Sequence, residues 1–212
     1  MIISKRHKFI FTAIPKTGTH SVRRALREHL AEGDHEQVGL FVQKRLPFAV
    51  LAALGHGHIS LMQVRPFLGE EEFAACLKFS FVRNPFDRFV SYCAFVTRED
   101  GEFLRRPREV MRHFLFKERP LDHLLFQPQH TFVTDGEGRL LVDMVGRVEE
   151  MQLCYDAICD RIGVPRSILD KINSTEHGKF REYYDAELVE GVADIYGRDL
   201  ELFGYSFDED VG

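Results

Sequence analysis

The sequence contains no long apolar run. Its apolar runs span only several residues, such as FIFTAI at residues 9–14, whereas a helix needs roughly 18–20 apolar residues to cross a bilayer. FIFTAI is also too short for the apolar part of a signal peptide, and Pro15 and Lys16 interrupt it at once. We therefore expect a soluble, cytoplasmic protein without a membrane span.

Cysteines are few, and none of them forms a CxxC pair. Reduced structural thiols are a better interpretation than a zinc site or a disulfide framework; the cysteines are Cys76, Cys93, Cys154 and Cys159. The chain also lacks internal repeats, low-complexity segments and flexible linkers. With 212 residues, 44% of them hydrophobic, it can bury a core without a metal or disulfide. We expect a single domain over residues 1–212.

Acidic residues are absent from the first 27 positions. The whole chain carries a net charge of −5, which argues against general affinity for nucleic acid or acidic membranes. Residues 1–27 nevertheless carry +7, so the other 185 residues sum to −12. A compact anion would therefore be attracted to the N-terminal part of the chain.

The pattern of residues 9–30 predicts a strand, a loop and a helix. The short apolar run at 9–14 is typical of a buried strand. Apolar residues and one histidine then recur at helical spacing, namely Val22, Ala25, Leu26, His29 and Leu30. The loop residues lie near the N-terminus of this helix, where backbone N–H groups and the helix dipole favour an anion.

A second unit repeats this order. Residues 76–82 (CLKFSFV) predict a strand, and Asn84-Pro85-Phe86-Asp87 is a strong signal for the start of a helix. Two strand–helix units favour an α/β fold with a central parallel sheet, whose ligands gather at the carboxyl ends of the strands. Further along we expect a helical basic stretch at 105–119, a hairpin at 132–142, and helices at 149–162 and 185–200.

The loop is not a conventional triphosphate loop. That motif needs GxxxxGK[ST], with glycines ahead of the lysine. Here no glycine precedes Lys16, and Gly18 follows it, which suits a single small tetrahedral anion. In the second unit, Arg83 at the strand end and Ser91 in the helix could hold another phosphate. Two such sites predict a ligand with two phosphate-like ends.

At this point the chain resembles the sulfotransferases. PKTGTHS resembles their 5′-phosphosulfate loop, and FVRNPFDRFVSYCAF resembles their 3′-phosphate motif in the RNPxDRxxSxY form of carbohydrate sulfotransferases. VGRVEEM and DLELFGYSF are similar too, so the resemblance covers most of the chain. It implies a P-loop-like three-layer fold, 3′-phosphoadenosine 5′-phosphosulfate (PAPS) as donor, and a hydroxyl acceptor, with a carbohydrate favoured.

Carried over position by position, the resemblance implies two sets of donor-binding residues. Those around the 5′ end are Lys16, Thr17, Gly18, Thr19, His20 and Ser21. Arg83 and Ser91 would hold the 3′-phosphate. Many relatives have Ser or Thr where this chain has His20, so His20 could contact the donor or only cap the helix. Arg83 and Ser91 have an alternative interpretation, namely a salt bridge to Asp87 and a capped surface helix.

Lys16 and two histidines are the catalytic candidates. Sulfuryl transfer needs positioning, neutralisation of the leaving oxygen, and removal of the acceptor's proton. Lys16 fits the second task, and a histidine fits the third. His56 and His58 stand in LGHGHISLMQV, which resembles the HGHxS segment of heparan and uronyl 2-O-sulfotransferases. Either could be the base, and we prefer His56. A metal site formed by the two histidines would need a third ligand, and none is recognisable nearby, so we expect no metal.

Two rival functions stay open at this stage. A small-molecule kinase would need a conventional triphosphate loop and acidic magnesium ligands, and the order of Gly and Lys counts against it. A non-catalytic nucleotide- or glycan-binding module could keep the same motifs. The basic stretch at 105–119 could receive an anionic glycan, although such a run is usually a solvated helix face.

Overall fold

The computed structural model describes residues 1–39, 45–170 and 179–208. These residues form two compact units. Unit 1 comprises the described residues of Met1–Val82 and Gln129–Ile172, and unit 2 comprises those of Arg83–Pro128 and Asn173–Gly212. The single domain expected from the sequence stays a prediction.

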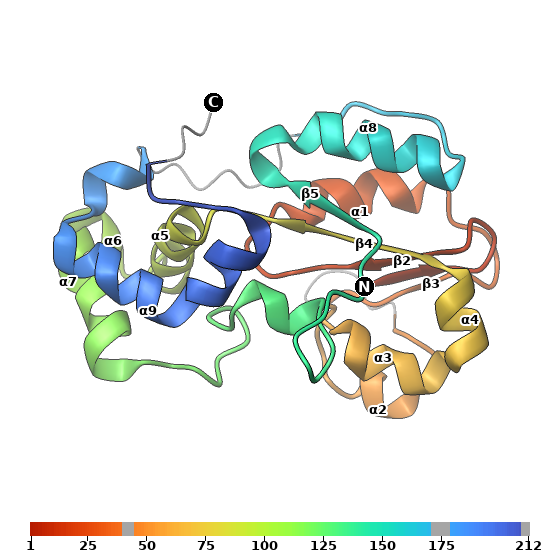
Figure 1. Ribbon diagram of the computed structural model, residues 1–212, viewed down its shortest axis with the longest axis horizontal. Helices are drawn as coiled ribbons and strands as arrows, with labels where there is room; N and C mark the ends of the chain where they lie inside the picture. The colour runs from red at the N-terminus through yellow and green to blue at the C-terminus, as the bar shows by residue number, and fades with distance from the viewer. Residues whose placement is uncertain (40–44, 171–178, 209–212) are drawn as a thin grey trace. The chain divides into compact units, whose positions relative to one another are not determined.

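Unit 1 is built around a mostly parallel sheet (Figure 1). The strands, in chain order, are β1 (Ile2–Ser4), β2 (Phe9–Thr12), β3 (His35–Glu36), β4 (Leu77–Val82) and β5 (Met144–Arg147), and their order in the sheet is β3-β1-β2-β4-β5. β4 is parallel to both β2 and β5, whereas β1 is antiparallel to β2 and β3. The predicted α/β fold is confirmed, with antiparallel β1 as an addition that the sequence did not predict.

Helices cover both faces of this sheet (Figure 1). Helices α1 (Thr19–Arg27) and α8 (Met151–Ile162) pack on one face, where Phe11 of β2 stacks on Phe79 of β4 with ring centroids 5.2 Å apart. The short helices α2 (Ala49–Ala52), α3 (Leu61–Leu68) and α4 (Glu70–Ala75) cover the other face. The three-layer arrangement follows, because each face of a sheet buried on both sides needs an apolar cover.

The two predicted strand–helix units are present. β2 leads through a loop into α1, and β4 ends immediately before the turn into α5 (Pro85–Val96). Asn84 caps α5 as its sequence predicts, since its side-chain oxygen accepts a hydrogen bond from the Phe86 amide at 3.0 Å. The predicted hairpin at 132–142 is reduced to one bridge between Thr134 and Leu140. Before it lies a 3-10 turn, η2 (Gln129–Phe132), and another, η3 (Val148–Glu150), precedes α8.

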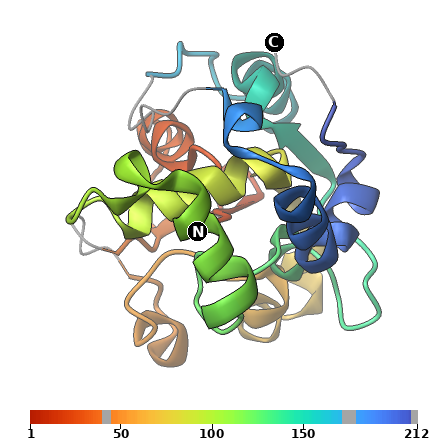
Figure 2. The same ribbon diagram turned by 90° about the vertical axis from the view of Figure 1, so that its left-hand side faces the viewer.

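Unit 2 is helical. It contains α5, α6 (Glu102–Arg105), α7 (Pro107–Arg112), the π-helical segment η1 (His113–Glu118), the 3-10 turn η4 (Phe180–Tyr183) and α9 (Ala186–Phe203). α7 continues directly into η1, as Figure 2 shows. The core of this unit is rich in aromatic rings, among them Phe86, Phe89, Tyr92, Phe126, Tyr184 and Tyr196. The predicted helices at 105–119 and 185–200 are thus confirmed.

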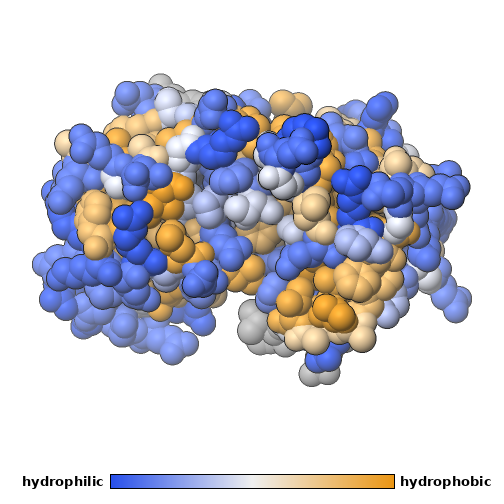
Figure 3. All heavy atoms as spheres, turned by 60° about the horizontal axis from the view of Figure 1, so that its bottom comes forward, coloured by the Kyte–Doolittle hydropathy of each residue, from blue (hydrophilic) through white to orange (hydrophobic). Residues whose placement is uncertain are grey.

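An exposed apolar surface lies on α2 and α3 (Figure 3). Its side chains are Val50, Leu54, Met62 and Phe67. The two helices flank the segment that carries His56 and His58, so apolar side chains stand on either side of that segment in the chain. Within the described part of the chain, no helix is long and apolar enough to cross a membrane.

Candidate functional site

The loop between β2 and α1 contains two residues in the left-handed backbone region. Lys16 and Gly18 both have φ of 66°, and for a residue with a side chain this conformation costs roughly 1–2 kcal/mol. Thr17 lies between them and stabilises the loop, because its hydroxyl donates a hydrogen bond to the Ile14 carbonyl at 3.0 Å. A non-glycine residue held in this conformation is typical of functional loops, which supports a role for Lys16.

The start of α1 is suited to an anion. The helix begins at Thr19, directly after the loop, and its first turn contains no acidic residue. Backbone N–H groups at such an end have no helical partner, and the helix dipole adds partial positive charge. The hydroxyl residues Thr17, Thr19 and Ser21 are buried here, whereas Lys16 is half-buried. The structure therefore gathers the predicted 5′ donor-binding residues at one helix end.

Met151 packs onto this loop from the first turn of α8. A Cβ atom placed on Gly18 would lie 2.5 Å from the Met151 Cε atom. Met151 closes the VGRVEEM stretch, so this stretch contacts the loop although 133 positions separate the two residues in the printed sequence. Glycine at position 18 meets both requirements, since it adopts the left-handed backbone and leaves room for this thioether.

His58 is attached to the same loop. Its Nδ1 lies 2.7 Å from the Ala13 carbonyl oxygen, and a carbonyl only accepts, so Nδ1 must carry the proton. Burial lowers the pKa of His58 to about 3, which keeps the ring neutral. In a neutral ring with a protonated Nδ1, Nε2 is the acceptor. The structure thus brings one of the two predicted histidines to the loop.

His56 lies beside His58, and the centroids of their rings are 6.3 Å apart. Its Nδ1 is buried and has no hydrogen-bond partner among the described residues, a situation that costs about 1–3 kcal/mol for a polar group. Burial lowers the pKa of His56 below its ordinary value of 6.5. Gln37 holds the backbone in place, because its side-chain amide donates to the carbonyl of His56 at 2.9 Å.

Gly57 lies between the two histidines, at a point where their segment comes close to Gln37 and to Arg23. A Cβ atom there would lie 2.0 Å from the Gln37 carbonyl oxygen and 3.2 Å from Nη1 of Arg23. Only glycine fits such a position. The sequence predicted that the glycines let the backbone turn tightly around both histidines. In unit 1, the glycine at position 57 is required because a larger residue would clash with the Gln37 carbonyl.

Arg23 is a residue that sequence reasoning missed. It lies on α1 with only 3% of its surface exposed, beside His20, whose Nδ1 is 3.4 Å from Nη2 of Arg23. Its position three residues before buried Leu26, on the apolar side of the helix, is the signal that could have identified it. Partial burial, together with the charges of Arg23 and Lys16, lowers the pKa of the exposed His20.

Two arginines lie near the buried carboxylate of Glu36. Arg27 binds the buried Glu36 carboxylate through two bonds, from Nε at 2.9 Å and from Nη2 at 2.8 Å. Arg23 is buried close to the same carboxylate, which raises its pKa against the larger lowering effect of burial. Among the described residues, two guanidinium groups therefore lie close to this carboxylate, and their positive charges would also be stabilised by a nearby anion.

The second motif lies in unit 2. Arg83 follows β4 directly, and its Nε donates to Asp87 Oδ2 at 2.6 Å, so the salt bridge considered as an alternative is formed. Ser91 is 2% exposed, and most of the residues of α5 are buried, so α5 is not a surface helix. Arg88 of the same motif is structural: its Nη2 donates to the Leu125 and Gln127 carbonyls at 3.2 and 2.7 Å.

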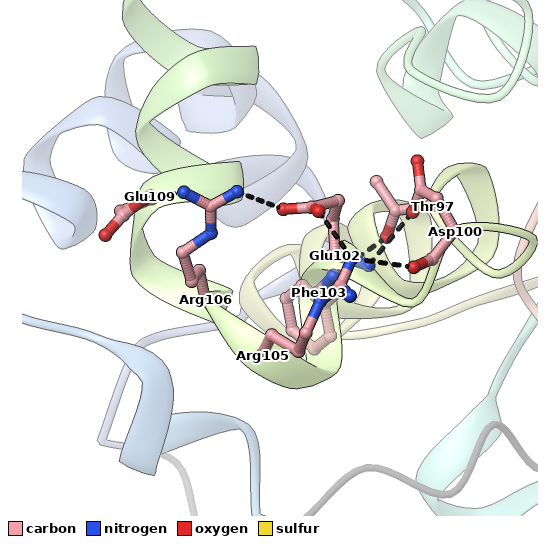
Figure 4. Close-up of polar contacts among 7 residues, drawn as sticks. All are labelled: Thr97, Asp100, Glu102, Phe103, Arg105, Arg106 and Glu109. Atoms are coloured by element: carbon pink, nitrogen blue, oxygen red, sulfur yellow. Dashed lines mark hydrogen bonds and ion pairs between the residues drawn. The ribbon is translucent and has the colours of Figure 1, made fainter.

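Most arginines of the basic stretch at 105–119 are paired with acidic side chains. Glu102 accepts from Arg105 at 2.5 Å and from Arg106 at 2.6 Å (Figure 4). Arg112 contacts Asp185, just before α9, and Glu187 within it. Arg108 instead donates to the backbone carbonyls of Glu182 and Tyr183. These contacts match the solvated helix face that such a run usually forms, and the glycan-binding alternative stays a prediction.

All four cysteines are free thiols. Three are buried, and Cys154 is partly exposed, in line with structural roles. Over residues 1–39, 45–170 and 179–208, no group of three or more His, Cys, Asp or Glu side chains is arranged to hold a metal ion.

Comparison with known proteins identifies one family. A model described as "Sulfotransferase family" matches residues 1–206. This range includes the loop, the histidine segment and the second motif. Searches of curated proteins and of solved structures found no match to the chain.

The close approach at Gly57 generates a prediction about stability. We expect Gly57→Ala to lower the free energy of unfolding by about 1–3 kcal/mol, since its Cβ would press against a backbone carbonyl that cannot move alone. Gly55→Ala is the matched control, because Gly55 has φ of 69° but open space around it, and only the backbone cost of about 1–2 kcal/mol applies. Gly136→Ala, in open space with an ordinary φ, should be near neutral. Urea denaturation of the three variants checks this, and equal stability of the Gly57 and Gly136 variants would contradict it.

Proposed function

Because this chain belongs to the sulfotransferase family, we propose that it transfers a sulfuryl group from PAPS to a hydroxyl group of a carbohydrate. The observation that carries the proposal is the hydrogen bond between His58 and the Ala13 carbonyl. It joins a candidate base segment to an anion-binding loop within unit 1.

The residues of unit 1 suit the 5′ end of such a donor. The start of α1 supplies backbone N–H groups, Lys16 supplies a charge, and the positive charges of Arg23 and Arg27 favour an anion nearby. When bound, PAPS supplies an activated sulfuryl group. Lys16 then stabilises the negative charge that develops on the oxygen between sulfur and the 5′-phosphate.

Arg83 and Ser91 are our candidates for the 3′-phosphate. Both belong to the FVRNPFDRFVSYCAF stretch, which resembles the 3′-phosphate motif of sulfotransferases. The bond from Arg83 Nε to Asp87 holds the plane of the guanidinium. A guanidinium held in one plane suits the two-point recognition of a phosphate.

The transfer forms a bond between the acceptor oxygen and sulfur while the bond from sulfur to the 5′-phosphate oxygen breaks. Adenosine 3′,5′-bisphosphate leaves, and the acceptor's proton must pass to a base. With its pKa lowered to about 3, His58 is a poor proton acceptor near neutral pH. We therefore assign proton removal to His56 and assign to His58 the task of holding the segment against the loop.

The donor assignment predicts selective binding of a nucleotide with phosphates at both ends. In calorimetry, adenosine 3′,5′-bisphosphate should bind at least about tenfold tighter than adenosine 5′-monophosphate, because a charge-assisted contact to the 3′-phosphate adds about 1.5–3 kcal/mol. Arg83→Ala should remove this difference. Arg24→Ala is the control, since Arg24 is exposed and contacts Asp170. Tighter binding of ATP than of the bisphosphate would favour a kinase and refute the assignment.

The assignment of the base predicts a pH profile. Only the neutral ring can take a proton, so kcat/KM should fall as the pH drops through the pKa of His56, which lies below 6.5. His56→Ala should lower kcat by about 10²–10⁴-fold, leave the affinity for the bisphosphate unchanged, and abolish this fall of kcat/KM at low pH. His58→Ala should weaken bisphosphate binding and leave the fall of kcat/KM at low pH in place. Near-normal rates in both variants would remove the two histidines from the mechanism.

The choice of acceptor is tested with labelled PAPS on a panel of oligosaccharides, phenols and small alcohols. We expect label to appear on oligosaccharides, in line with the RNPxDRxxSxY form of the second motif. Transfer to small alcohols alone would overturn the carbohydrate assignment and leave sulfuryl transfer intact. Bisphosphate binding without transfer to any acceptor would favour a non-catalytic module.

A further inference from the structure

Arg23 has an environment that a structural ion pair does not account for. The carboxylate whose charge acts on it, Glu36, is held by two bonds from Arg27. Burial lowers the pKa of Arg23 more than Glu36 raises it. Burying a guanidinium costs several kcal/mol unless other interactions offset that cost, so Arg23 is retained in an unfavourable place.

The guanidinium of Arg23 lies between two parts of the site. Its Nη2 is 3.4 Å from Nδ1 of His20, at the start of α1. Its Nη1 is 3.2 Å from the position that a Cβ atom would take on Gly57, between the paired histidines. An arginine donates and never accepts, so His20 receives this contact on a lone pair of Nδ1. That geometry requires an Nδ1 without a proton.

A fixed positive charge in this position has an electrostatic effect on the site. A bound anionic donor would favour protonation of the neighbouring imidazoles, and a protonated base cannot take the acceptor's proton. A buried cation opposes that protonation, and burial leaves it little screened by salt. Among the described residues, the charged and titratable groups that interact with Arg23 are Glu36, Arg27, His20, His58 and the amino group of Met1.

We propose that Arg23 is a positioning residue that packs the histidine segment against α1 and, as a fixed buried charge, opposes protonation of His20 and His58 while an anionic donor is bound. The role in turnover rests on the proposed sulfuryl transfer. The effect of Arg23 on the histidine rings does not, and it can be measured without any substrate.

The test compares Arg23→Gln, Arg23→Lys and the control Arg24→Gln, which removes a charge from the exposed side of the same helix. In NMR titrations of the histidine rings, Arg23→Gln should raise the pKa values of His20 and His58 by about one pH unit, as loss of a nearby charge does. Arg23→Lys keeps the charge, so the pKa values of both rings should stay close to those of the parent protein. Arg24→Gln should change neither pKa value. Equal shifts in the Arg23→Gln and Arg24→Gln variants, or none in either, would overturn the proposal.

Glu36→Gln provides a test that leaves Arg23 in place. It removes the only carboxylate named among the groups facing Arg23, so the pKa values of both rings should fall, opposite in sign to the effect of Arg23→Gln. If Arg23→Gln fails to fold, the ring pKa values of Glu36→Gln still test the proposed role of Arg23. A rise, or no change, in both rings would count against the proposed role.

The ring titrations keep the role of Arg23 separate from the proposed function, because they need no substrate. If the parent protein transfers no sulfuryl group, the proposed function fails, and the ring titrations still decide whether Arg23 controls the histidines.

Discussion

The hydrogen bond from His58 Nδ1 to the Ala13 carbonyl is the contact on which the candidate site depends. It joins two segments that lie 45 residues apart in the chain, at a distance of 2.7 Å. One partner precedes the loop with Lys16, and the other belongs to the loop between α2 and α3. The bond also determines the chemistry of the ring, because a carbonyl partner assigns the proton to Nδ1 and leaves Nε2 as the acceptor. A single interaction thus sets both the position and the protonation pattern of His58.

Around this bond, close packing and charge act together. Gly57 leaves room for the Gln37 carbonyl and for the guanidinium of Arg23. The resulting cluster places two arginines against one buried carboxylate, Glu36. Arg23 and Glu36 are buried, so their charges are little screened by salt. The positive charge of Arg23 thus favours a nearby anion and, at the same time, the neutral forms of His20 and His58.

The sequence predicted the parts of this protein that local patterns encode. The strand–loop–helix unit with Lys16, the Asn84 cap of α5, and the helices of the C-terminal half all follow from the order of neighbouring residues. It did not predict β1 and β3, which are three and two residues long and too short to show an alternating pattern. The hairpin at 132–142 was only partly right, because turn residues around Asp135 suggest a reversal but do not ensure strand pairing.

By itself, then, the sequence determined the loop that carries Lys16, its place at a helix start, and the family, because motifs of this kind depend on residues within one or two turns of each other. Only the tertiary structure decided that Arg23 is buried beside His20 and Gly57, that Met151 packs on the loop, and that Arg105 and Arg112 are paired with carboxylates on α6 and α9. Most of those contacts join residues far apart in the chain. Their charge balance and burial arise from how the layers pack, and no local pattern in the sequence records that packing.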